Sequence, residues 1–542
     1  MTSPYLPALL TVLVAASPSA QACGGFFCSQ SQPVIQNAER IVFAMDGEDI
    51  ETHVQIFYEG PSEEFAWIVP VPTVPETFLS TDSLFNTLAF QTGPVFSLNI
   101  VDEGKCREGN LFRGNLEFAL DSGVALSDDG VDVVDLKQVG PYDTAVLQAA
   151  DTSELMAWLG DNGYDLPQGV EDLLTPYAAD GAYFLALKLS KNKDTGDIAP
   201  IGFRYSSTKV AIPIQLTSVA AAPDMRVETY VFGEHRVVPE SYLHVKINDA
   251  AVNWWNGGQN YAKVITKAAN EAGGHAFATD FAGSPEFMIG QLWSEGRLDQ
   301  DQLETSTNAA SWLDEVRFQI PVNNTLLDVI ETHIDLPAGV DPADFYNCPD
   351  CYDGWKNQPF DGVAATADLW EFVVEPLQTA EALFEHPTLS RMTSSLDAVE
   401  MTVDPVFVQN PDMGDVSQTH QATLVYECNG RKRDKARRRL ELTDGRAISL
   451  PSENWFAKND TTEFAFIKEL GGINAQIIEK TGASGQPEII DDYTGYLAQQ
   501  TDEFNQSVRS MLGCGCASTG GPSGGFFGLV LAALCLRRRR TA

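Results

Sequence analysis

Nine cysteines are the residues of this sequence whose type and spacing carry the most chemistry. Three lie in the C-terminal tail, and six lie in the body of the chain: Cys23, Cys28, Cys106, Cys348, Cys351 and Cys428. An even number of body cysteines favours disulfides in an oxidising compartment. Spacing makes Cys23–Cys28 and Cys348–Cys351 natural local pairs, and elimination leaves Cys106–Cys428, although many other pairings of six cysteines exist.

The segment Cys348-Pro349-Asp350-Cys351 is a C-x-x-C motif, which is also compatible with a thiol–disulfide protein. A reactive cysteine needs a lowered pKa, whereas the nearby Asp341, Asp344 and Asp353 would raise the pKa of a thiol. The motif lacks the second C-x-x-C or histidine pair that a zinc site needs. A structural disulfide is therefore the favoured interpretation.

The seven histidines form no i, i+4 pair and no H-E-x-x-H motif. An extracellular hydrolase would therefore need a site assembled from distant acids and histidines. A buried pocket with two close carboxylates, or a serine or cysteine within hydrogen-bond reach of a histidine, would favour that hypothesis. No nucleotide-binding fingerprint is present, so the sequence identifies no catalytic residue and predicts no cofactor.

An acidic turn offers weak candidates for calcium ligands. Its carboxylates are Asp128, Asp129, Asp132 and Asp135, which supply the hard oxygen ligands that calcium prefers. Their spacing does not match an EF-hand loop, so a solvated acidic surface is the favoured interpretation.

The net charge of the 542-residue chain is −40, from 75 acidic and 35 basic residues. Such a chain repels phosphate backbones, which argues against nucleic-acid binding. One basic run, Arg431 to Arg439, places seven cations in nine positions. We expect it to pair with acidic faces or to lie on a solvated hairpin. The alternative is binding to anionic surface polysaccharide or to lipid headgroups.

The first 22 residues have the pattern of a signal peptide. A short apolar run from Ala8 to Ala16 precedes Ala20-Gln21-Ala22, an A-x-A cleavage site for signal peptidase. The run is too short to span a bilayer, and no Lys or Arg precedes it. Cleavage would leave Cys23 first, so a lipid-modified Cys23 is an alternative, and a buried N-terminal helix is another.

Residues 513–542 form a three-part tail. Gly513-Cys514-Gly515-Cys516 leads into small residues, then the apolar run Phe526 to Leu536, and then Arg537 to Arg540. The apolar run is about half the length of a membrane span, and the arginines would stay on the cytoplasmic side. Such a tail can pause the chain in a membrane while an enzyme acts at Cys514 or Cys516. A C-terminal membrane anchor is the alternative.

This tail resembles the MYXO-CTERM sorting signal of myxobacteria and their relatives. The resemblance covers about thirty residues, in the order cysteine motif, apolar helix and arginine cluster. It implies a sortase-like processing protease as a partner and a mature protein anchored at the cell surface or outer membrane through its processed C-terminus.

The hydrophobic periodicity predicts an α+β fold with mainly antiparallel sheets and packed helices, and with more helices in the second half. Alternating runs predict half-buried strands over much of 41–100, at 131–136, 183–189, 210–216, 227–231 and 423–428. Helices are predicted near 83–90, at 152–162 and 170–180, at 366–384 and at 499–511. Three prolines closely follow the apolar run at 65–69, which favours an edge strand or an extended crossover over a central strand.

Several segments are similar to the bacterial family called domain of unknown function 2330. The matching segments, in order, are CGGFFC at 23–28, AERIVFAMDGEDIETHVQIFYEG at 38–60, FAWIVPVPTVPE at 65–76, MAWLGDNGYDLP at 156–167, YFLALKL at 183–189 and EMTVDPVFVQNPD at 400–412. The resemblance runs from residue 23 to about 430. It implies an exported, cysteine-containing protein and supplies no catalytic residues.

Together these observations predict four regions: a signal peptide at 1–22, a β-rich domain at 23–250 with a helical insertion around 151–180, a mixed α/β region at 251–512, and the sorting tail at 513–542. The leading hypothesis is an exported surface protein, with a binding or envelope-structural role and no enzyme activity. Its expected partners are signal peptidase, the processing protease and the cell envelope. The hydrolase and the thiol–disulfide protein remain the alternatives.

Overall fold

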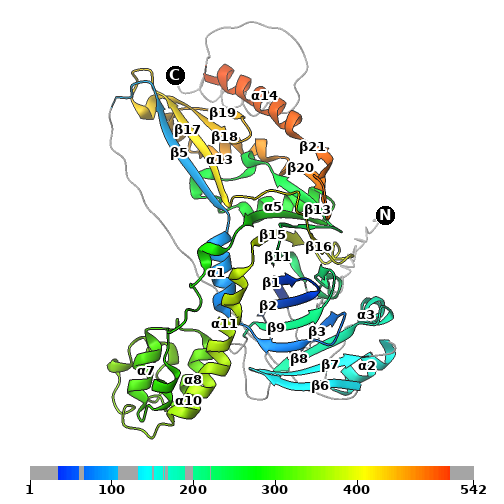
Figure 1. Cartoon of the computed structure of the whole chain (residues 1–542). Helices are drawn as coiled ribbons and strands as arrows, with labels where there is room; N and C mark the ends of the chain where they lie inside the picture. Colours follow the sequence, from blue (N-terminus) through cyan, green and yellow to red (C-terminus); the bar gives the residue numbers. More distant parts are fainter. Residues whose placement is uncertain are drawn as a thin grey trace, which may run out of the picture.

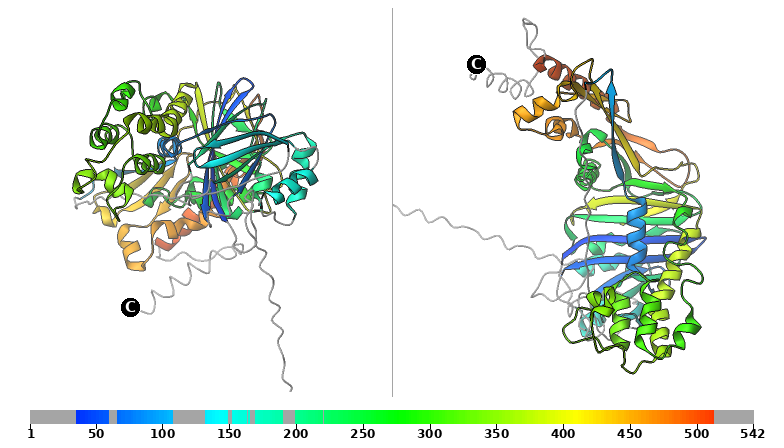
Figure 2. Two further views of the ribbon diagram at one scale, coloured as in Figure 1. Left: turned by 90° about the horizontal axis from the view of Figure 1, so that it is seen from below. Right: turned by 90° about the vertical axis from the view of Figure 1, so that its left-hand side faces the viewer.

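The computed structural model describes most of the body of the chain, in the ranges 35–59, 66–107, 132–148, 152–162, 164, 169–189, 199–219 and 221–512. A central sheet occupies the middle of the molecule, and three smaller parts surround it (Figure 1). A helical lobe and a small sheet with two helices lie at one end, and a second four-stranded sheet lies at the other (Figures 1 and 2). The predicted α+β fold, with more helices in the second half, is confirmed.

The central sheet has ten strands, in the order β21-β20-β13-β14-β15-β11-β1-β2-β9-β4. Neighbours pair antiparallel except for β1 with β11 and β13 with β14. The sheet uses strands from both sides of residue 250, so the two halves of the body share it. Its strands are β1 (Ile35–Asp46), β2 (Asp49–Glu59), β4 (Glu76–Leu79), β9 (Ile201–Ser206), β11 (Ala221–Gly233), β13 (Leu243–Ile247), β14 (Ala276–Gly283), β15 (Thr388–Leu396), β20 (Ala475–Lys480) and β21 (Glu488–Asp492).

The central strands are buried on both faces, not on one face as the alternation predicts. In β15, every residue after Thr388 is buried. One face packs on a cluster that includes Phe43, Val231 and Met392. The other face packs partly on the helical lobe and partly on α5 (Tyr261–Glu271).

The helical lobe is built around a continuous helical run that matches the prediction for 366–384. It consists of α10 (Gly362–Leu369), a π-helical turn (Trp370–Val374) and α11 (Glu375–Ala382). Pro376 lacks the N–H that an α-helix would use at this point, and the Glu375 N–H bonds to the carbonyl of Trp370, five residues back. The other helices packed here are α1 (Asp82–Thr92), α6 (Gln300–Glu304), α7 (Ala309–Arg317), α8 (Asn324–His333) and α9 (Pro342–Asn347).

A four-stranded sheet with the order β3-β8-β7-β6 lies beside the central sheet. Its edge strand is β3 (Ala66–Val71), which contains Pro70, so the predicted edge strand is confirmed. Trp158, Leu174 and Phe184 form the core between this sheet and its helices. The remaining elements are β6 (Asp132–Val139), β7 (Tyr142–Gln148), β8 (Tyr183–Leu189), α2 (Thr152–Asp161) and α3 (Val170–Ala179).

The strand predicted at 210–216 is wrong. Only β10 (Val210–Ala211) is extended, and α4 (Ile214–Thr217) follows it. Pro213 cannot donate a ladder hydrogen bond and instead precedes the helix. Val210, Ile212, Ile214 and Leu216 are all buried, so the alternation reported burial correctly but not backbone conformation. β10 belongs to a three-stranded sheet with β16 (Val406–Gln409) and β12 (Val237–Pro239).

The second four-stranded sheet, which we call the β17 lobe, has the order β19-β18-β17-β5. Its last helix, α14, covers the edge of β19: the Asn505 side chain accepts from the Ser449 N–H at 2.7 Å and donates to the Ala447 carbonyl at 2.8 Å. The elements of this lobe are β5 (Val95–Glu103), β17 (Thr419–Glu427), β18 (Arg437–Leu442), β19 (Ala447–Leu450), α12 (Glu453–Asn459), α13 (Glu463–Ile467) and α14 (Thr494–Leu512).

Short 3-10 turns complete the described structure: η2 (Asp249–Ala251), η3 (Trp254–Asn256), η4 (Glu286–Met288), η5 (Pro349–Cys351), η7 (Leu383–Glu385), η8 (Arg433–Lys435) and η9 (Lys468–Gly471). Within the described ranges, every helix is too short or too polar to cross a bilayer.

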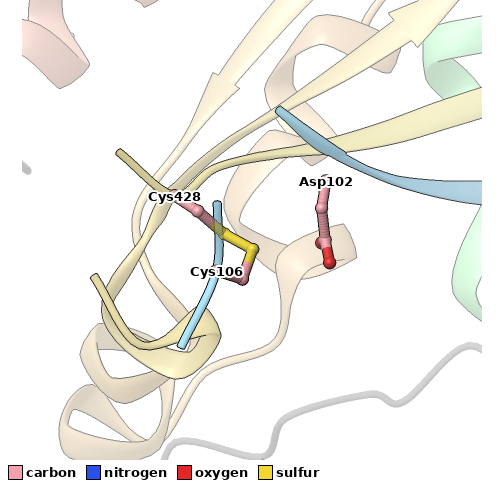
Figure 3. A group of neighbouring side chains, drawn as sticks. All are labelled: Asp102, Cys106 and Cys428. Atoms are coloured by element: carbon pink, nitrogen blue, oxygen red, sulfur yellow. A yellow bond between two sulfur atoms is a disulfide. The ribbon is translucent and has the colours of Figure 1, made fainter. Parts of the chain in front are cut away.

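In the described part of the chain, two disulfides link residues at very different separations in the sequence. Cys106 bonds to Cys428 across 322 residues and joins the end of β5 to the end of β17 (Figure 3). Cys348 bonds to Cys351 across three residues. A longer closed loop loses more entropy in the unfolded chain, so the first bond constrains that state more strongly.

We therefore expect the C106A/C428A variant to lose about 5 kcal/mol of unfolding free energy and the C348A/C351A variant about 2 kcal/mol. Denaturant titration of both variants and of the parent under non-reducing conditions measures the difference. Equal losses would show that the long-range bond does not stabilise the fold through loop closure.

Candidate functional site

A row of polar side chains crosses one face of the central sheet, where an apolar surface would be expected. Cross-strand register aligns it, because Arg40 on β1 lies opposite Gln55 on β2 and opposite Glu228 on β11. The next strand along the sheet, β15, contributes Arg391, and β14 contributes Asp280. On its other side the row continues to α1, where Asp82 accepts from the Gln55 amide at 2.6 Å.

Hydrogen bonds and ion pairs connect this row. Arg40 donates to Gln55 Oε1 at 3.3 Å and, through Nε, to Glu228 Oε2 at 3.0 Å. Arg391 lies between two carboxylates, 3.5 Å from Glu228 Oε1 and 3.3 Å from Asp280 Oδ2. Arg391, Glu228 and Asp280 are all buried, so each of these charges depends on its neighbours for compensation.

Asp280 is held by two hydroxyl groups besides Arg391. The Thr393 hydroxyl donates to Asp280 Oδ2 at 2.6 Å, and the Tyr261 hydroxyl of α5 donates to Oδ1. The pairing of β14 with β15 shifts register between Thr279 and Phe281, and this irregularity accommodates Asp280. A bulge of this kind re-aims a side chain, here toward the interior between sheet and helix.

The two carboxylates have pKa values shifted in opposite directions. Burial raises the pKa of Asp280, and the opposing effects of Arg391, Thr393 and Tyr261 do not fully offset it. Burial also acts on Glu228, but Arg391, Arg40 and Arg226 outweigh it and lower the pKa of Glu228. One site thus contains a carboxylate that readily stays ionised and another that resists ionisation.

A cavity of about 150 Å³ lies beside these groups, between the sheet and α5. Its polar lining includes Asp224, Arg226, Glu228, Tyr261, Asp280 and Arg391. Charged groups of both signs, with hydroxyl groups between them, favour a small polar molecule or ordered water over an apolar ligand. No histidine of the described chain lines this cavity.

A separate serine–histidine pair lies at β2 and β4. His53 Nδ1 is 2.7 Å from Ser80 Oγ, and His53 Nε2 is 2.8 Å from Glu51 Oε1. In a Ser-His-Asp triad, Nε2 faces the serine and Nδ1 faces the acid, so the ring is reversed here. His53 is 0% exposed and Ser80 is 3% exposed, which leaves little room for a substrate at the hydroxyl.

The cysteines that the sequence offers as functional candidates differ in their structural surroundings. Cys106 and Cys428 lie near Asp102, but their sulfurs bond to each other and cannot act as thiolate ligands (Figure 3). Cys348 and Cys351 follow the C-terminal end of α9, where the helix dipole opposes a thiolate. Cys23, Cys28, Cys514 and Cys516 lie outside the described residues.

The weak calcium candidates remain a prediction. Asp128 and Asp129 lie outside the described residues. Asp132 and Asp135 belong to β6, and the structure describes their backbone only.

Sequence reasoning missed the charged row. Arg40, Glu228, Asp280 and Arg391 each stand inside a strand, where a charged residue ordinarily indicates a solvent-facing position. The available signal was that a large apolar residue stands directly beside each of them, as in VETYVF at 227–232. The pairing itself joins residues up to 188 positions apart and has no local pattern.

The fold and the site define an α+β protein with a buried ionic row, a polar cavity and, among the described residues, two disulfides. Residues 17–286 match the model of a family described as an uncharacterized protein conserved in bacteria (DUF2330), and the chain belongs to this family. The match ends well before residue 430, so the segment at 400–412 lies beyond it. No curated protein and no solved structure matches the chain.

We expect R391A to destabilise the protein by about 3–5 kcal/mol, because it leaves Glu228 and Asp280 buried without their shared cation. Arg226 also contacts Glu228, at 3.4 Å, but its side chain is 46% exposed. R226A should therefore cost less than about 1 kcal/mol. Denaturant titration compares the two variants, and a loss for R391A no greater than that for R226A would contradict the role given to Arg391.

Proposed function

We propose that the protein is exported and held at the cell surface or outer membrane, where its body acts as a binding protein. The observation that carries this proposal is the pairing of four body cysteines in two disulfides. Disulfides persist in oxidising compartments and are rare in the cytosol. The signal-peptide pattern at 1–22 supports the same destination.

The end of the described body suits processing by a membrane protease. α14 packs on the β17 lobe through Phe504 and Val508 and ends at Leu512. The motif with Cys514 and Cys516 follows directly in the sequence. Signal peptidase at one end and a sortase-like protease at the other are the partners that this proposal requires.

The cavity beside Arg391 supports binding more than catalysis. Its ionisable groups are engaged with one another, and a guanidinium separates the two carboxylates. Ligand sites typically offer a few fixed polar groups in a concave, largely preformed pocket. The polar lining favours a small polar molecule as the ligand.

Mass spectrometry of the cell-associated protein tests the proposal at both ends. We expect a mature N-terminus at or near Cys23, a C-terminus near Cys514 or Cys516, and cysteines 106, 428, 348 and 351 in disulfide form. A mature protein that retains Arg537 to Arg540, or that carries free thiols in the cytosol, would contradict it.

An extracellular hydrolase is the second candidate, because two specific observations favour it. Glu228 and Asp280 have pKa values shifted apart, which is a common feature of acid–base pairs. Ser80 lies within hydrogen-bond reach of His53. Against it stand the shared guanidinium between the carboxylates and the burial of both Ser80 and His53.

A fluorophosphonate probe distinguishes the two candidates at Ser80. We expect no labelling of the purified full chain, because the serine is buried and the imidazole is reversed. Stoichiometric labelling that disappears in S80A but persists in the S83A control, which alters a serine at the start of α1, would favour the hydrolase instead.

A further inference from the structure

The basic run at 431–439 separates into two groups in the structure. Three arginines are held by acids of the β17 lobe. Arg433 Nε is 3.0 Å from Asp102 Oδ1, and Arg438 reaches Glu463 at 2.9 Å. Arg439 lies among three carboxylates, including that of Glu441 at 2.7 Å. These three cations are therefore neutralised within the protein.

The other cations of the run are exposed, and two more join them from the end of β5. We call this group the basic tip: Lys105, Arg107, Arg431, Lys432, Lys435 and Arg437. Within the described chain, none of the six makes a side-chain hydrogen bond or an ion pair. The sequence alone does not show that these cations form one group, because about 325 residues lie between its two segments.

The backbone fixes the two segments of the basic tip side by side. The Gly430 N–H donates to the Lys105 carbonyl at 3.0 Å, and the Arg107 N–H donates to the Arg431 carbonyl at 3.1 Å. The disulfide between Cys106 and Cys428 closes the same point, with a Cα–Cα distance of 5.0 Å (Figure 3). The cations are therefore held together on a rigid framework.

Among the residues that the structure describes, the acids near the basic tip are already engaged. Asp102 binds Arg433, while Glu103 and Glu427 bind Arg439. The Asp434 carboxylate accepts from the Asn454 amide. The tip therefore concentrates positive charge on a chain whose net charge is −40.

The basic tip also lies at the end of the molecule where the described chain leaves for its tail. α14 lies at the same end of the molecule as the far ends of β5 and β17, in Figure 1 and in the right-hand view of Figure 2. Cys106 and Leu512 pack against the same hydrophobic cluster. A chain anchored beyond Leu512 would thus bring this end close to the membrane.

We propose that the basic tip rests on the anionic headgroups of the lipid bilayer next to the anchor. The proposal rests on the surface anchoring proposed above, and it adds a second contact that sets the orientation of the body. A weak anchor and a polybasic patch together give stable attachment where either alone is marginal. The Debye length is about 8 Å at physiological salt, so the acidic body beyond the tip is largely screened from the surface.

Vesicle sedimentation of the full chain tests the basic tip. The vesicles are phosphatidylcholine with or without phosphatidylglycerol. The tip variant is R107Q/R431Q/K432Q/K435Q. The matched control is K209Q/K263Q/K267Q/K480Q, which removes four exposed lysines outside the β17 lobe and leaves the same net charge. All proteins keep the same tail, so its arginines contribute equally to every measurement.

Each cation near an anionic surface contributes about fivefold in partitioning, which corresponds to ~1 kcal/mol. We expect the parent and the control to bind the anionic vesicles more tightly than the neutral ones, and the tip variant to lose at least tenfold. Raising the salt concentration should remove most of the difference. Unchanged thermal unfolding of both variants shows that they remain folded.

Equal partitioning of the tip variant and the control would overturn the proposal. So would a tip variant that loses binding to an anionic polysaccharide, such as polygalacturonate, while its vesicle binding is unchanged. The vesicle assay does not depend on C-terminal processing. Failure of the anchoring proposal would instead appear in the mass spectrum of the cellular protein, so the two failures are distinguishable.

Discussion

Arg391 imposes the constraint on which the middle of the structure depends. A guanidinium buried between two carboxylates must keep both partners, because removal of any one leaves an uncompensated charge in the interior. Its partners come from different strands, Glu228 on β11 and Asp280 on β14. The same three side chains therefore hold the order β14-β15-β11 together and define the cavity under α5.

This order has a consequence for the family to which the chain belongs. The matched residues, 17–286, include β11 and β14 but not β15, which lies between them in the sheet. Without β15 the matched region would have a gap in its central sheet, and its two buried acids would lack their cation. The residues after 286 thus complete the fold of the family region instead of adding an independent domain.

The local sequence pattern predicted most of the helices and strands, but it could not predict pairing between residues that are far apart in the sequence. The helix at 366–384 followed from its apolar stripe, and the edge position of β3 followed from its prolines. The alternation of apolar residues at 210–216 correctly indicated which residues are buried, whereas Pro213 determined the backbone conformation there. The ionic row and the basic tip were not predicted, because the roles of Arg391 and Lys105 depend on residues well over a hundred positions away.

The way α14 covers β19 bears on how this protein would respond to mechanical load. The amide of Asn505 takes the place of a neighbouring strand, so the edge of β19 is shielded by a helix. Tension transmitted through a tether beyond Leu512 would act on that helix before it reached any strand. Peeling α14 away would uncover an unpaired β-edge, to which another strand could pair.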